Sequence, residues 1–174
     1  FSGKSGETLL IVALDDSSSY DGSCAMDSLI TDQLARHIKK AFSYLNIEVH
    51  HSSISYSKDF LNQLSCRYIL GGTIKQLALF SRSHLTQSAD FFQELSVASV
   101  TIQITLYDKK FGKTIFSLPE TSELTANFST INEWDFVKDL GCRIDDKAFT
   151  QTLISQALYD CFDKIIATLE KHQF

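Results

Sequence analysis

The sequence predicts an α/β (α+β) protein built on a single mixed sheet, with its elements in the order β-α-β-α-β-β-β-α. The short apolar run Thr8–Leu14 is typical of a strand buried on both faces. Apolar residues at steps of three and four from Met26 to Leu45 predict an amphipathic helix. Alternation from Val97 to Asp108 predicts an antiparallel strand with one face exposed. Because the apolar face of such a sheet needs a cover, we expect helices mainly on one face.

Three elements lie between this first helix and the alternating strand. We expect a strand at Ile47–His50, a short helix at Lys58–Cys66, a long strand at Tyr68–Phe80 and then a polar loop at 81–93. Two neighbouring glycines, Gly71 and Gly72, indicate a bulge or the close approach of another backbone.

The C-terminal half continues with a hairpin. Asp108–Gly112 predicts its turn, in which Gly112 takes a positive φ, and Lys113–Asn127 is the returning strand. We expect a loop over 128–145 and a closing helix over Asp146–Lys171, capped by Asp145 and Asp146. In the alternating strand Val100, Ile102, Ile104 and Leu106 should be buried against the two long helices.

Length and composition favour one domain over 1–174, with a flexible N-terminal segment (1–7) and an insertion (128–145) before the last helix. A hydrophobic content of 44% excludes a disordered chain. Lys and Arg number 16 and Asp and Glu 21, so the net charge of -5 argues against a nucleic-acid partner. No apolar run approaches the length of a membrane-spanning helix.

The four cysteines are far apart, which excludes zinc ribbons and thioredoxin-like redox motifs. Cys161 has apolar neighbours at helical spacing, so we expect a buried structural thiol. Cys24 and Cys142 both fall in predicted loops and are the pair most able to meet.

The polar stretch after the first strand carries one candidate metal site. Asp15-x-Ser17-x-Ser19 resembles the metal-ion-dependent adhesion motif of von Willebrand A domains, in which carboxylate and hydroxyl oxygens hold a divalent cation. In that interpretation Thr73 and Asp108 stand near the other ligands. The alternative is a loop whose Asp and Ser side chains satisfy backbone donors, and we favour it because Thr73 lies within an extended pattern. We therefore expect no metal.

The histidines form no cluster in the sequence, and no nucleophile motif is present. His50 and His51 are adjacent and would point to opposite faces of a strand, while the other histidines lie in separate elements. We predict that the protein is not an enzyme and needs no cofactor.

Large apolar side chains gather in the predicted insertion, namely Phe128, Ile131, Trp134 and Phe136. They either cover the sheet or form an interface with a partner, since interfaces favour Trp at their centre. The acidic neighbours Glu133, Asp135 and Asp139 favour a protein partner over a membrane.

Several segments together resemble a group of bacterial envelope lipoproteins. These are Leu9–Leu14, Ala35–Phe42, Cys66–Ile74, which is similar to the group's Ala-Asp-Tyr-Val-Leu-x-Gly strand, and the terminal helix. Val100–Ser117 is similar to the group's Leu-x-Asp-x-x-Thr-Gly-Lys-x-x-Trp hairpin, with Phe111 for the Thr and Phe116 for the Trp.

The group comprises TolB amino-terminal-like domains, the curli secretion lipoprotein, penicillin-binding-protein activators and ABC-transport auxiliary lipoproteins. The resemblance implies a non-enzymatic module on the periplasmic face of the outer membrane. It implies assembly into a homo-oligomer or into an envelope transport, secretion or cell-wall complex. Membrane attachment would come only through an N-terminal lipid anchor outside this chain.

Overall fold

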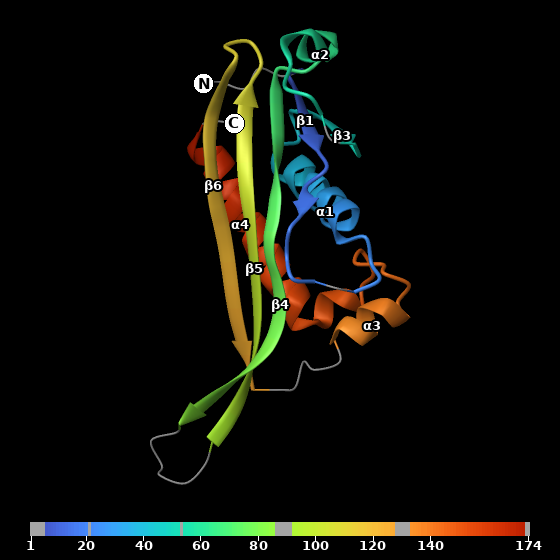
Figure 1. Cartoon of the computed structure of the whole chain (residues 1–174), viewed down its shortest axis with the longest axis vertical. Helices are drawn as coiled ribbons and strands as arrows, with labels where there is room; N and C mark the ends of the chain where they lie inside the picture. Colours follow the sequence, from blue (N-terminus) through green and yellow to red (C-terminus); the bar gives the residue numbers. More distant parts are fainter. Residues whose placement is uncertain (1–5, 21, 53, 86–91, 128–132, 173–174) are drawn as a thin grey trace.

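A mixed sheet forms the centre of the molecule (Figure 1). The structure, a computed structural model, describes residues 6–20, 22–52, 54–85, 92–127 and 133–172. Its strands are β1 (Thr8–Val12), β2 (Asp15–Asp16), β3 (Asn46–His50), β4 (Tyr68–Leu85), β5 (Phe92–Asp108) and β6 (Lys113–Ala126). Its helices are α1 (Met26–Ala41), α2 (Lys58–Gln63), α3 (Glu133–Asp139), the 3₁₀ turn η1 (Phe149–Gln151) and α4 (Leu153–Lys171).

The strands lie in the order β3-β1-β4-β5-β6, with the short β2 against β4. β1 runs parallel to β3 and to β4, whereas β4, β5 and β6 are antiparallel neighbours. The predicted fold class and the predicted single mixed sheet are therefore confirmed. The structure adds β2, α3 and η1 to the predicted order.

The alternation along β5 sorts its side chains as predicted. The inward residues are fully buried: Ala98, Val100, Ile102, Ile104 and Leu106. On the opposite face Thr101, Gln103 and Thr105 are half-exposed, and the hydroxyls of Thr101 and Thr121 lie 3.0 Å apart. Ser99 departs from the pattern because it is buried. The predicted register of the strand is confirmed.

Two cores of unequal size lie on the two faces of the sheet. α1 and α4 pack with the inward side of β5 to form the larger core. α2 contributes Leu61 to a smaller core with Leu10, Val12, Cys66 and Ile69. β1 sends alternate side chains into both cores, which explains its continuous apolar run.

The hairpin of β4 and β5 is longer than the sequence predicts. β4 continues to Leu85 and β5 starts at Phe92, so the predicted polar loop over 81–93 is wrong for most of its length. The polar residues remain in strands because their backbones stay paired, with Ser81 opposite Ser96 and Arg82 opposite Leu95. Exposed polar side chains do not interrupt such a ladder.

The helix boundaries also differ from the prediction. α1 ends at Ala41 rather than Leu45, because Phe42 leaves the helical conformation, with φ -117° and ψ 62°. α4 starts at Leu153, where Thr152 caps it by accepting the Ser155 N–H at 3.2 Å. Asp146 caps no long helix, because its carboxylate accepts the Ala148 N–H in the preceding turn.

The predicted structural role of Cys161 agrees with its position in α4. The side chain is fully buried, and burial raises the pKa of the thiol to about 12. Within the described ranges, no helix is long and apolar enough to cross a membrane.

Candidate interaction site

Trp134 lies in α3 and packs against Tyr20 from the segment after β2. The two ring centroids are 4.8 Å apart, and the planes are tilted by 55°. Both side chains are half-buried and contact the main core, so each leaves part of its surface accessible. The predicted loop over 128–145 is therefore corrected, because Glu133–Asp139 is helical.

The two rings form one wall of a groove of about 510 Å³. Three parts of the chain line it: Ser19, Tyr20, Gly22 and Ser23 after β2; Leu77, Ala78 and Leu79 of β4; and Trp134, Asp135 and Lys138 of α3. Leu77, Ala78 and Leu79, which we call the floor, are aliphatic. The remaining residues include serine hydroxyls and one charge of each sign, Asp135 and Lys138. Such a mixture suits a peptide or protein surface with an apolar centre and a polar edge.

The start of α3 is held against the start of α4. The Glu133 carboxylate accepts the N–H of Leu153 at 2.7 Å and that of Ile154 at 3.1 Å. These N–H groups have no partner within their own helix, so a carboxylate from outside stabilises the end of α4. The same bonds place Trp134, the next residue, over the sheet.

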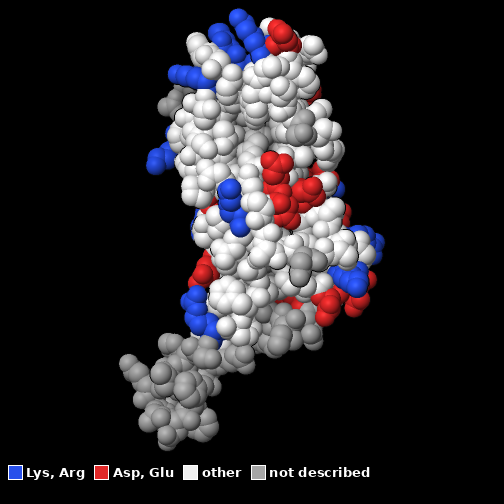
Figure 2. All heavy atoms as spheres, viewed as in Figure 1, with Lys and Arg blue, Asp and Glu red and all other residues white. Residues whose placement is uncertain are grey.

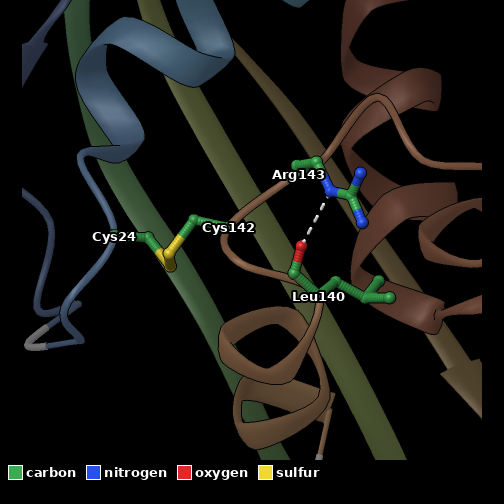
Figure 3. Close-up of a disulfide and its surroundings, with 4 residues drawn as sticks. All are labelled: Cys24, Leu140, Cys142 and Arg143. Atoms are coloured by element: carbon green, nitrogen blue, oxygen red, sulfur yellow. Dashed lines mark hydrogen bonds between the residues drawn. A yellow bond between two sulfur atoms is a disulfide. The ribbon is translucent and has the colours of Figure 1, made fainter.

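A disulfide joins the segment before α1 to the turn after α3 (Figure 3). Cys24, just before α1, is bonded to Cys142, just after α3, across 118 residues of sequence. The turn at Cys142 is closed by its own N–H to the Val137 carbonyl and by the Arg143 Nε–H to the Leu140 carbonyl, at 3.1 Å. The two cysteines that the sequence indicated as the pair most able to meet are thus joined.

Gly22 makes room for the Tyr20 ring. A Cβ built on Gly22 would lie 2.0 Å from Tyr20 Oη, so any larger residue would displace this side chain. The position of Tyr20 in the groove wall thus depends on a glycine two residues away.

Only part of the predicted aromatic interface can be placed. Trp134 lines the groove, and Phe136 is 38% exposed on the outer side of α3. Val137, the residue after Phe136 in α3, is buried in the core. Phe128 and Ile131 lie outside the described residues.

The three residues of the candidate metal motif, Asp15, Ser17 and Ser19, make different contacts in the structure. Asp15 lies in β2 opposite Thr73, and the Ser17 hydroxyl donates to the Ile74 carbonyl at 3.3 Å. Ser19 lines the groove instead. Asp16 makes the loop bond, accepting the Ser18 N–H at 2.9 Å.

The remaining expected ligands do not complete the adhesion motif. Thr73 lies within β4, and buried Asp108 pairs with Arg67 at 3.6 Å. No group of three or more His, Cys, Asp or Glu in the described part of the chain could hold a metal ion. This arrangement lends the adhesion-domain hypothesis no support.

Sequence reasoning did not anticipate Tyr20 or the Leu77–Leu79 floor. Tyr20 stands in a polar loop and contacts Trp134 across more than one hundred residues, which no local pattern reports. The local signal in the sequence was Tyr20, an aromatic residue in a polar stretch, followed two residues later by Gly22.

Comparisons with known proteins place this fold among bacterial proteins. No family model and no curated protein matches the sequence. The hypothetical protein CT253 from Chlamydia trachomatis matches with a TM-score of 0.63 at 14% identity, over 94% of this chain and 95% of that one. The chain has the fold of that protein.

Two further solved structures share the fold. A putative neuraminyllactose-binding hemagglutinin homolog from Helicobacter pylori has a TM-score of 0.58 at 8% identity, covering 99% of this chain and 92% of its own. Protein XCC0632 from Xanthomonas campestris, of family DUF330, has a TM-score of 0.54 at 12% identity, covering 92% and 82%. Bacterial lipoproteins are also among the similar structures, with TM-scores of 0.46, 0.41 and 0.35. The agreement in fold rests on the three structures above.

Proposed function

We propose that the protein is a non-enzymatic lipoprotein module of the bacterial envelope, on the periplasmic face of the outer membrane. It acts by binding, either to copies of itself or to a transport, secretion or cell-wall complex. The proposed contact surface is the groove of Tyr20 and Trp134, together with exposed Phe136; the groove is lined by Ser19, Tyr20, Gly22, Ser23, Leu77, Ala78, Leu79, Trp134, Asp135 and Lys138. This surface is the observation that carries the proposal.

The disulfide supports an envelope location. Disulfides persist in oxidising compartments such as the bacterial periplasm and are rare in the cytosol. Cys24 directly follows Ser23, which lines the groove, so the same bond ties one side of the proposed contact surface to the turn after α3.

The two remaining cysteines have the properties of structural residues. Cys66 and Cys161 are free but buried, and burial raises the pKa of both thiols. A thiol nucleophile requires the opposite, an accessible group with a lowered pKa. Their properties therefore agree with structural roles.

The experiment compares Phe136→Ala and Trp134→Ala with the wild type in two separate measurements, thermal unfolding and association. Association is measured by sedimentation of the chain alone and by in vivo crosslinking through a photoreactive residue at position 136. Phe136→Ala should abolish association with an unchanged Tm, because its ring is exposed in the free chain. Trp134→Ala should abolish it too and lower stability by about 1 kcal/mol, since its ring also packs on Tyr20.

Tyr44→Ala is the matched control. Tyr44 is an exposed aromatic, 41% accessible, and lies outside the groove lining. This variant should associate like the wild type. Full association by Phe136→Ala and Trp134→Ala, with only Tm lowered, would contradict the proposal and assign Trp134 to the core.

A further inference from the structure

The turn between β5 and β6 carries the most exposed large hydrophobic side chain in the described part of the protein. Phe111 is 62% exposed at the end of the elongated molecule where β5 meets β6 (Figure 1). Beside it Tyr56 is 51% exposed, and its ring meets that of Tyr107 with centroids 5.5 Å apart. An aromatic surface of this kind at one extremity is suited to contact with something outside the molecule.

The turn holds Phe111 in a defined position. Asp108, 3% exposed, accepts the backbone N–H of Lys110 at 2.8 Å and that of Phe111 at 3.3 Å. Asp108 is itself held by Arg67, and Gly112 takes a φ of 62°, as the sequence predicts. The exposed ring is therefore presented by a turn that is ordered before any contact forms.

Lysines surround this ring. The ammonium groups of Lys110 and Lys113 lie 5.5 and 5.8 Å from the centre of the Phe111 ring. Lys58 of α2 and Lys109 line the adjoining pocket of about 500 Å³, together with Tyr56, Tyr107 and Phe111. None of the described residues lining that pocket is acidic.

The charge of this end differs from that of the whole chain. The net charge is -5, yet Figure 2 shows Lys and Arg side chains gathered at the end that carries the turn. Asp59 of α2 is exposed close to Lys58, and the three exposed lysines, Lys58, Lys110 and Lys113, outnumber it. An anionic surface would repel most of the molecule and attract this end, so the charge distribution also selects an orientation.

The start of β1 lies at the same end. The Arg67 guanidinium donates to the Glu7 carboxylate at 2.6 Å, and the Lys109 N–H donates to the Arg67 carbonyl at 2.9 Å. The described part of the chain therefore begins at the end of the molecule that carries the Phe111 turn.

We propose that Phe111 with Lys58, Lys110 and Lys113 forms a docking tip that inserts an aromatic ring among the headgroups of an anionic lipid membrane, while the Lys109 ammonium donates to the Leu64 carbonyl. An aromatic ring flanked by lysines is the combination that binds at a lipid interface, with the ring at headgroup depth and the ammonium groups on phosphates. The inference rests on the proposed envelope location for its setting. It replaces the expectation that the membrane is contacted only through an anchor outside the chain.

The test measures binding of the unlipidated 174-residue chain to vesicles of phosphatidylcholine, with and without phosphatidylglycerol. The wild type should bind the anionic vesicles and release them as salt rises toward about 1 M, where the Debye length falls to about 3 Å. Lys110→Ala combined with Lys113→Ala should weaken binding about thirtyfold, since each lysine near such a surface contributes about 1 kcal/mol. Phe111→Ser should weaken it about tenfold, and Phe111→Trp should retain it.

Lys75→Ala combined with Lys147→Ala is the matched control. Both lysines are exposed, and both lie away from the tip, Lys75 within β4 and Lys147 just before η1. Their removal changes the net charge by the same amount as Lys110→Ala combined with Lys113→Ala, and it should leave vesicle binding unchanged. An equal loss in this control would show that total charge, and not the tip, drives binding, and would overturn the proposal.

Phe111→Trp in a Trp134→Phe background reports insertion directly. Its fluorescence should shift to the blue with anionic vesicles and stay unchanged with pure phosphatidylcholine. Failure of the wild type to bind anionic vesicles, or an unshifted Trp at position 111 in bound protein, overturns the docking tip. Because this assay needs neither a lipid anchor nor a protein partner, its outcome is independent of the association experiment on Phe136.

Discussion

At position 72 of β4 there is no space for any side chain. A Cβ on Gly72 would lie 1.9 Å from the carbonyl oxygen of Gln103 on β5, so the strands could not keep their spacing. Gly72→Ala should therefore lower the free energy of unfolding by about 3 kcal/mol, because the overlap is with backbone and no side chain can turn away. Urea unfolding monitored by circular dichroism measures this loss.

Gly71 provides the control one residue away. A Cβ there would meet Tyr56 Oη at 3.5 Å, an ordinary contact, so Gly71→Ala should change stability by less than about 1 kcal/mol. Equal losses in the two variants would refute the close-approach explanation and point to strand propensity instead. The paired glycines in the sequence indicated a close approach but not which of the two requires it.

The side chains on the two faces of β5 contribute differently to the free energy of unfolding. Ile104 is fully buried in the core beneath α1 and α4, so Ile104→Ala should lower the free energy of unfolding by about 2–5 kcal/mol. Gln103→Ala, on the opposite face, should cost less than about 1 kcal/mol, because Gln103 loses only a hydrogen bond to the Ser117 hydroxyl. Calorimetry on both variants measures the difference, and similar losses would contradict the register.

Across the whole molecule, the disulfide joins segments that are far apart in sequence. The bond closes a separation of 118 residues, so Cys24→Ser combined with Cys142→Ser should lower the free energy of unfolding by about 2–4 kcal/mol. The association of the variant should also weaken, because the loop carrying Tyr20 loses its attachment beside Trp134.

Thiol titration checks this connectivity. Unreduced protein in denaturant should show the two thiols of Cys66 and Cys161, and the folded protein should react slowly at both because they are buried. Four reactive thiols in unreduced, denatured protein would contradict the disulfide.

Most of the sheet, and which of its faces are buried, follows from local sequence patterns. The alternation of β5, the turn at Gly112 and the apolar stripes of α1 and α4 are local patterns, and local patterns report which face of an element is buried. The same patterns misplaced the end of β4, since Arg82 is held in the strand by its partner Leu95 and not by its own polarity.

The contacts between segments that are distant in sequence are visible only in the folded molecule. Trp134 was visible in the sequence as an unexplained aromatic, but its groove also needs Tyr20, Leu77 and the carboxylate of Glu133 on the start of α4. Asp15 and Ser19 share a sequence motif, yet the chain gives one to a strand and the other to the groove. Contacts between distant segments depend on how whole elements pack, and periodicity within one element carries no record of that packing.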